Sequence, residues 1–147
     1  MTVHHSLAAP RGRLGSLDRL RRQTQVRVVL RRGLRKAGAF LQFIAAQPPS
    51  DPATGAGLDP PAPRVRLAIS VAKAAGNAPK RARLRRLVRA AFRALRHTWP
   101  SPADCLVIAR TPWPAVRLAD VIAELADLSA AVFRRWPPLN GRKRRDR

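Results

Sequence analysis

Hydrophobic and polar residues alternate most regularly between residues 64 and 72. In an extended chain every second side chain points to the same side, so this alternation predicts a β-strand. Residues 38–46 are rich in aromatic and branched side chains, and residues 104–109 form a short apolar run. Both compositions are typical of strands, and the pattern alone therefore predicts three strands.

Three other segments repeat their apolar residues with the spacing of a helix. Residues 24–32 predict a short helix with Thr24 in the N-cap position and Gly33 after its last turn. Residues 78–97 and 115–136 predict two longer helices, each with one apolar stripe. The expected order is helix, strand, strand, helix, strand, helix, which includes a strand–helix–strand crossover.

Proline content and charge indicate where the folded part begins and ends. Residues 47–63 contain six prolines and two glycines, so no regular element can run through them and we expect an exposed insertion. We expect one domain over residues 16–136. A flexible basic segment at residues 1–15 would precede it, and a flexible basic tail at residues 137–147 would follow it.

The predicted helix of residues 78–97 carries an unusual concentration of positive charge. Asn77 and Pro79 supply a helix-start signal, and residues 73–96 contain nine cationic side chains and no acid. Like charges four residues apart destabilise an isolated helix, so we expect this face to meet regularly spaced anionic oxygens. RNA or DNA phosphates provide such oxygens. The face consists of Arg81, Arg85, Arg89, Arg93 and Arg96.

The composition of the whole chain strengthens this interpretation. The 147 residues include 30 Lys and Arg against 8 Asp and Glu, a formal net charge of +22, and 46% of the residues are apolar. The apolar fraction suffices for a modest core, while the charge makes attraction to polyanions nearly unavoidable. The alternative is a basic surface that meets only solvent, with arginines that reflect a GC-rich genome.

The sequence lacks the residue patterns that several classes of enzyme and metal-binding protein require. Two-metal phosphodiester hydrolysis needs converging carboxylates, but no acid occurs between Asp59 and Asp104. The sequence has neither a phosphate-binding P-loop nor the spacing of zinc ligands. We therefore predict no catalytic residue and no metal site in the protein, and we expect any catalytic metals in RNA cleavage to be held elsewhere.

The single cysteine and the hydropathy bear on location. Cys105 lies in an apolar run, which predicts a buried packing role, and one cysteine excludes an intramolecular disulfide. No apolar stretch approaches the length of a membrane span. We therefore expect a cytoplasmic protein with no membrane partner.

The segment from Leu67 to Phe92 resembles the signature of the bacterial ribonuclease P protein component. That family has a Ser-Val-Ser-Lys-Lys strand end, a Gly-Asn-Ala turn and then a helix with an Arg-Asn-Arg motif. The chain departs from it at Ala74, in place of the second lysine, and at Ala82, in place of the asparagine between the arginines. The chain agrees with it at Ser70, Val71, Lys73, Gly76, Asn77, Ala78, Arg81, Arg83, Arg85, Arg86 and Arg89.

The resemblance implies both a fold and a function. The fold would be a single small α+β domain, ribosomal protein S5 domain 2-like, with a roughly four-stranded, mostly antiparallel sheet, helices and a left-handed βαβ crossover. The chain would be the protein subunit of ribonuclease P, in which an RNA subunit removes the 5′ leader from precursor tRNA. The protein would bind that RNA and the leader and assist cleavage at low magnesium, with Mg²⁺ bound mainly by RNA.

The resemblance also implies two binding surfaces. The family usually has aromatic residues on the first helix where this chain has Val26 and Leu30, so stacking on a leader base would fall to Phe43, unless that ring belongs to the core. The leader-binding cleft would include Val26, Leu30, Phe43, Arg66 and Ser70. The RNA subunit would bind to Lys73, Asn77, Lys80, Arg81, Arg83, Arg85, Arg86 and Arg89.

Two other classes of function stay open from the residues alone. A ribosomal or other structural RNA-binding protein would share the arginine face and the net charge, but its affinity for precursor tRNA would not rise with a 5′ leader. A DNA-binding module would place the long helix in a major groove. The helix lacks the Asn or Gln that would help to read base edges there.

Overall fold

The computed structural model describes residues 19–20, 22–48 and 64–136. The predicted tails and most of the predicted insertion at residues 47–63 lie outside this part. The described elements are α2 (Gln23–Arg32), β1 (Leu34–Ala37), β2 (Leu41–Ala46), β3 (Val65–Val71), α3 (Ala78–Leu95), β4 (Ala103–Ala109) and α4 (Leu118–Arg134). Short 3₁₀ turns follow β3 and α3, at Lys73–Ala75 and Arg96–Thr98.

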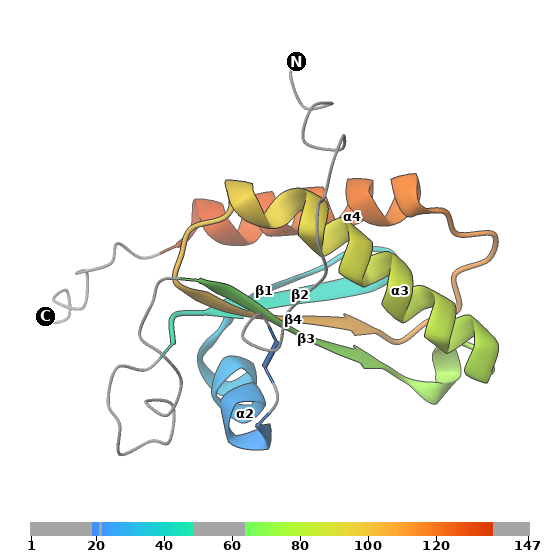
Figure 1. The fold of residues 1–147 in the computed structure, drawn as a ribbon, viewed down its shortest axis with the longest axis horizontal. Coiled ribbons are helices and arrows are strands. Elements are labelled where there is room, and N and C mark those ends of the chain that lie inside the picture. Colours follow the sequence, from blue (N-terminus) through green and yellow to red (C-terminus); the bar gives the residue numbers. More distant parts are fainter. Residues whose placement is uncertain (1–18, 21, 49–63, 137–147) are drawn as a thin grey trace, which may run out of the picture.

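The four strands form one sheet in the order β1-β2-β4-β3. β1 with β2 and β2 with β4 pair antiparallel, whereas β3 pairs with β4 in parallel. Helices α3 and α4 cover one face of this sheet, and α2 covers the other (Figure 1). The fold class is therefore the expected α+β domain with a mostly antiparallel sheet.

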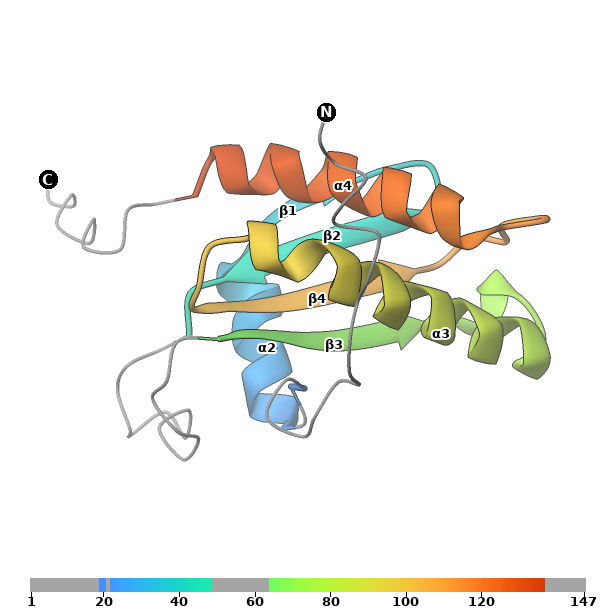
Figure 2. The same cartoon turned by 45° about the horizontal axis from the view of Figure 1, so that its top comes forward.

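The crossover from β3 through α3 to β4 has the less common hand. Seen from the side of α3 with the strands pointing upward, β4 lies to the left of β3, so the connection is left-handed (Figure 2). Parallel crossovers are right-handed in about 98% of cases. The resemblance predicted this exception, whereas the general rule for such units would have predicted the opposite hand.

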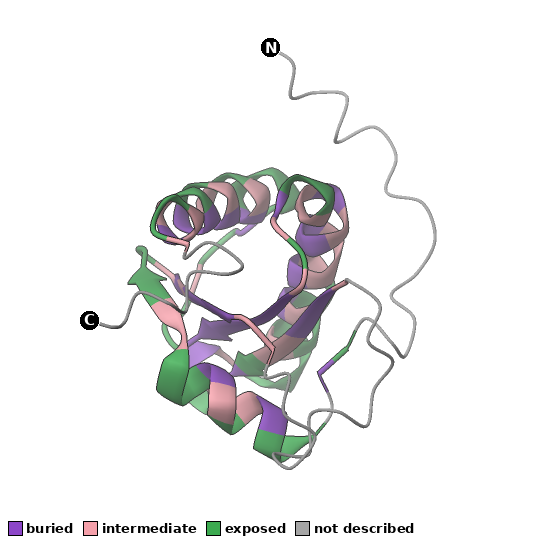
Figure 3. Ribbon diagram, turned by 90° about the vertical axis from the view of Figure 1, so that its left-hand side faces the viewer, coloured by how far each residue is buried: buried purple, intermediate pink, exposed green. Residues whose placement is uncertain are grey.

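Buried residues lie on both faces of the sheet. The larger cluster lies between the sheet and α3 and α4, and it includes Phe43, Phe92 and Trp99. A smaller cluster beneath α2 includes Val29 and Ile44. Figure 3 shows the buried positions on the strands and on the inner sides of the helices. Because β2 is covered on both faces, its last four residues, Phe43 to Ala46, are all apolar and buried rather than alternating.

The hydropathy pattern missed β1. Its residues, Leu-Arg-Lys-Ala, form a short strand at the edge of the sheet, and three of the four are exposed. Exposed edge strands carry charged side chains and lack an apolar period. The predicted strand at residues 38–46 accordingly began too early, because residues 38–40 form the turn between β1 and β2.

Gly33 allows α2 to end directly against the sheet. Its N–H donates to the carbonyl oxygen of Val29 at 2.8 Å, which confirms its predicted place after the last helical turn. A Cβ atom at this position would lie 2.5 Å from Cγ2 of Ile44 and 2.6 Å from the Val29 oxygen. Only glycine fits there without a shift of the backbone, and the position of α2 over the sheet depends on it. Thr24, in contrast, lies inside the helix, and Arg22 is the N-cap.

Candidate RNA-binding surfaces

Helix α3 begins where the sequence predicted, and its cap holds a residue that was expected to bind RNA. The side-chain Oδ1 of Asn77 accepts a hydrogen bond from the backbone N–H of Lys80 at 3.1 Å. This bond satisfies one of the backbone donors that a helix start leaves free. The role of Asn77 is therefore at least partly to fix the start of the helix that carries the arginines.

Helix α3 buries an apolar stripe against the sheet, and its arginines lie outside this stripe. Leu84, Val88 and Ala91 are buried against the sheet, as their spacing predicted. Four arginines one turn apart are half-buried along one side of the helix, and we call them the α3 arginine face: Arg81, Arg85, Arg89 and Arg93.

Three of the four acids among the described residues are engaged away from this face, and the fourth, Asp127, is exposed on α4. Asp104 forms an ion pair with Arg66 on the sheet. An oxygen of Asp120 accepts from the backbone N–H of Arg117 at 2.9 Å. One oxygen of Glu124 accepts from the N–H groups of Phe40, the last residue of the turn, and Leu41, the first residue of β2, at 2.7 Å each. These carboxylates serve local structure, so the α3 arginine face keeps its charge for an outside partner.

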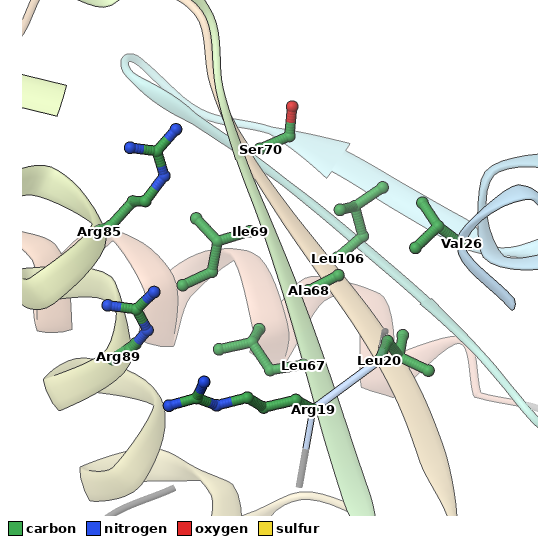
Figure 4. Close-up of a pocket in the computed structure, with 10 residues that line it drawn as sticks. All are labelled: Arg19, Leu20, Val26, Leu67, Ala68, Ile69, Ser70, Arg85, Arg89 and Leu106. Carbon is green, nitrogen blue, oxygen red and sulfur yellow. The ribbon is translucent and has the colours of Figure 1, made fainter. Parts of the chain in front are cut away.

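A cleft lies beside the α3 arginine face, along the edge of β3 that does not contact β4. Its volume is about 370 Å³. In Figure 4 the guanidinium groups of Arg19, Arg85 and Arg89 lie on one side of β3. Val26 and Leu106 lie on the other side. The cleft therefore combines cationic and aliphatic walls. We call it the edge cleft, and it is lined by Arg19 and Leu20 before α2, Val26 of α2, residues 67–70 of β3, Arg85 and Arg89 of α3, and Leu106 of β4.

The charges around the edge cleft are close enough to repel one another. Partial burial, together with the positive charges of Arg19, Arg85 and Arg93, lowers the pKa of the Arg89 guanidinium from its usual value. Arginine stays charged at all physiological pH values, so the repulsion persists in the free protein. An anion in the cleft would relieve it.

The structure brings together only part of the predicted leader-binding residues. Val26 and Ser70 line the edge cleft. Leu30 lies on α2 with 39% of its surface exposed but outside the cleft lining. Phe43 is completely buried under α3 and α4, where its ring centroid lies 5.1 Å from that of Trp99. A base cannot reach this ring, so the core alternative for Phe43 is correct.

Arg66 was also misplaced by the sequence interpretation. Its Nε donates to Oδ1 of Asp104 at 2.8 Å, and its Nη2 donates to Oδ2 at 3.0 Å. Both side chains are buried, with 8% and 3% of their surface exposed. Arg66 is therefore part of a buried ion pair between neighbouring strands and does not present its charge to a leader.

Among the residues that the structure describes, no group of three His, Cys, Asp or Glu side chains gathers in a way that could hold a metal ion. In the same residues, no helix combines the length and the apolar character that crossing a membrane requires.

The sequence and the fold match those of a known family. The family model described as Ribonuclease P matches residues 14–132. The chain belongs to the ribonuclease P protein family. It is 39% identical over 85 residues to the ribonuclease P protein component of Shouchella clausii, a match that covers 56% of this chain and 67% of that protein. It is 38% identical over 63 residues to the protein component of Syntrophus aciditrophicus, covering 43% and 53% respectively.

Solved structures of ribonuclease P proteins share the fold. The protein from Thermotoga maritima matches with a TM-score of 0.61 and 23% identity, over 76% of this chain and 96% of that one. The protein from Staphylococcus aureus matches with a TM-score of 0.61 and 22% identity, over 79% and 97%. The chain is thus a protein component of ribonuclease P, an endoribonuclease that processes the 5′ leader of precursor tRNA together with an RNA subunit.

Two arginines of this ribonuclease P protein, Arg19 and Arg83, have structural contacts that the sequence interpretation did not give. Arg19 was not singled out, because it stands before the first helix with no local pattern around it. Leu20, whose apolar side chain is buried beneath α2, is the signal that this segment packs on the domain. Arg83 was expected to bind the RNA subunit, and this stays a prediction. In the structure its exposed side chain also donates from Nη1 to the carbonyl oxygen of Val116 at 2.7 Å and so ties α3 to the loop before α4.

Replacing Arg83 with alanine is expected to lower the free energy of unfolding by about 1 kcal/mol, because the Val116 carbonyl loses its charged donor. Arg86→Ala is the matched control, since Arg86 is an exposed arginine on the same helix and its loss should change stability by less than about 0.5 kcal/mol. Urea denaturation of both variants measures the difference. Equal stabilities would show that Arg83 does not tie the two helices together.

Proposed function

We propose that this chain binds the ribonuclease P RNA through the outer side of α3 and holds the 5′ leader of precursor tRNA in the edge cleft. The observation that carries the proposal is the α3 arginine face, which has no acid on its helix and adjoins a cleft with an aliphatic wall. Clefts for single strands combine positive charge with surfaces on which sugars and bases can pack. Because precursor tRNA is the proposed substrate, we place the protein in the cytoplasm.

The hydrolytic step is assigned to the RNA subunit. The edge cleft offers guanidinium, hydroxyl and aliphatic side chains, whereas Mg²⁺ prefers carboxylate, carbonyl and water oxygens. The side chains of the cleft therefore do not suit Mg²⁺. In the holoenzyme we expect Mg²⁺ to be bound mainly by RNA, with the protein in a supporting role.

The supporting role follows from charge. Each arginine or lysine that contacts a phosphate releases condensed cations and reduces the repulsion between two RNA molecules. Divalent magnesium reduces the same repulsion. A protein with a net charge of +22 is thus expected to lower the magnesium concentration that the RNA subunit needs to bind its substrate.

Reconstitution tests this function. Addition of the full chain to a ribonuclease P RNA at low magnesium should accelerate leader removal from precursor tRNA by about tenfold or more, equivalent to about 1.4 kcal/mol. The control is the same reaction at high magnesium, where the acceleration should shrink. A structural RNA-binding protein would leave the cleavage rate at low magnesium unchanged, and this result would contradict the proposal.

A further inference from the structure

Two segments that are distant in the sequence bring three arginines to the edge of β3. Arg19 forms a parallel bridge with Leu67, and the N–H of Leu20 donates to the carbonyl oxygen of Leu67 at 2.9 Å. The bridge fixes Arg19 on one border of the edge cleft, opposite α3. Figure 4 shows its side chain extending towards the helix that carries Arg85 and Arg89.

The backbone of β3 adds a donor to this cluster. The even-numbered residues that flank β3 form backbone hydrogen bonds with β4. The N–H of Ala103 donates to the carbonyl oxygen of Arg64, and the N–H of Ala72 donates to the carbonyl oxygen of Ala109. The odd-numbered positions face the other way, as the bond between Leu20 and Leu67 shows. The N–H of Ile69 therefore points into the open edge. The described residues supply it with no hydrogen-bond acceptor.

We propose that Arg19, Arg85, Arg89 and the N–H of Ile69 together bind one internucleotide phosphate of a single-stranded RNA that passes along the edge of β3. The inference rests on the proposed function of the edge cleft as the leader site, and it names the group that the site recognises. The planar donors of a guanidinium group match the oxygens of a phosphate. Three guanidinium groups should bind the negative charge of a phosphate more strongly than one group alone.

The other wall of the cleft favours an RNA strand over a free phosphate ion. Val26 and Ala68 are half-buried and present aliphatic surface on the opposite side of β3 from the arginines, above the buried side chains of Leu20 and Leu106. A nucleotide whose phosphate meets the arginines can lay its sugar or base on this surface, whereas inorganic phosphate has nothing to place there. None of the described residues that line the cleft is aromatic, so we expect little preference for a particular base.

The proposal divides the arginines of α3 between two partners. Arg85 and Arg89 line the edge cleft and would contact the leader. Arg86, the exposed neighbour of Arg85, lies outside the lining and would meet the RNA subunit. Residues with the same charge on the same helix should therefore respond differently to the presence of a leader. This difference can be measured.

The experiment compares holoenzymes reconstituted with wild-type protein, Arg19→Ala, Arg89→Ala and the matched control Arg86→Ala. Each is titrated with precursor tRNA that has a single-stranded leader and with mature tRNA that has none. Arg19→Ala and Arg89→Ala should each weaken binding of the leader-bearing RNA about tenfold and change binding of mature tRNA less than about twofold. For the leader-bearing RNA, the slope of log affinity against log salt should fall by about one. Arg86→Ala should affect both RNAs equally.

Further variants and a second probe separate the outcomes. Arg19→Lys keeps the charge without the fork and should recover part of the lost affinity, which global unfolding would not allow. Backbone NMR of the full chain should show the Ile69 amide shifting at a much lower concentration of a short oligoribonucleotide than of inorganic phosphate. Equal midpoints for the two would mean a free-phosphate site and overturn the proposal.

Loss of affinity that is the same with and without a leader would also overturn it, because it would place Arg19 and Arg89 on the RNA subunit. This failure is distinct from failure of the proposed function. A wild-type protein that accelerates cleavage at low magnesium, but whose Arg19→Ala variant shows no leader-specific loss, would retain the function and lose only the phosphate site.

Discussion

Replacement of Phe43 by alanine is expected to lower the free energy of unfolding by about 3–5 kcal/mol and to leave the affinity of the folded protein for a leader unchanged. Phe43 is among the largest fully buried side chains of the domain. Its ring lies 5.1 Å from that of Trp99 and 5.7 Å from that of Phe133, measured between centroids. Alanine would leave a cavity at the centre of this aromatic cluster.

Urea denaturation measures the stability of Phe43→Ala, and leader affinity is measured under conditions where the variant is folded. Phe43→Leu is the graded control, since it keeps most of the apolar volume and should cost less than the alanine variant. The opposite outcome would be a loss of about 1–3 kcal/mol in leader binding with stability unchanged, as expected for a ring that stacks on a base. That result would place Phe43 in the binding surface after all.

The residues around Phe43 explain why the sequence could not decide its role. In a sheet with one covered face, alternation separates buried from exposed positions. Here α2 covers one face and α3 with α4 cover the other, so that the neighbours Phe43 and Ile44 are both completely buried. Because both residues are apolar, the sequence does not mark either face of the strand as the one that meets solvent. Only the tertiary arrangement tells which face each of them meets.

Features with local causes were predicted well. The start of α3 depends on Asn77 and on its bond to the N–H of Lys80, three residues away. The buried stripe of that helix and the half-buried arginine face beside it follow from a period of 3.6 residues, which the sequence displays directly. The same holds for Gly33, whose N–H bonds to Val29 within the last turn of α2.

Features that depend on distant partners were not predictable from local patterns. Arg83 bonds to Val116, Arg66 bonds to Asp104, and Arg19 lies against Leu67. In each case an arginine that looks like a free cation in the sequence has its place set by a residue more than 30 positions away. Net charge therefore predicts the class of partner, while the fold decides which cations are available to it.

Replacement of Asp104 by alanine is expected to lower the free energy of unfolding by about 3–5 kcal/mol, because it leaves the buried guanidinium of Arg66 without its counter-charge. The two residues are direct neighbours on the parallel strands β3 and β4, and two hydrogen bonds join them at 2.8 and 3.0 Å. Urea denaturation of Asp104→Ala measures the loss. Asp127→Ala is the matched control, since it removes an exposed acid from α4.

The double variant Arg66→Met with Asp104→Leu separates the ion pair from the volume that it fills. Apolar residues of similar size should restore most of the stability lost in Asp104→Ala, because the desolvation cost of both charges disappears with their attraction. If the pair also fixes the alignment of β3 against β4, the double variant should fold and yet bind leaders more weakly, since Ile69 and Ser70 of β3 line the edge cleft. Full leader affinity in a stable double variant would show that apolar packing and backbone pairing alone align β3.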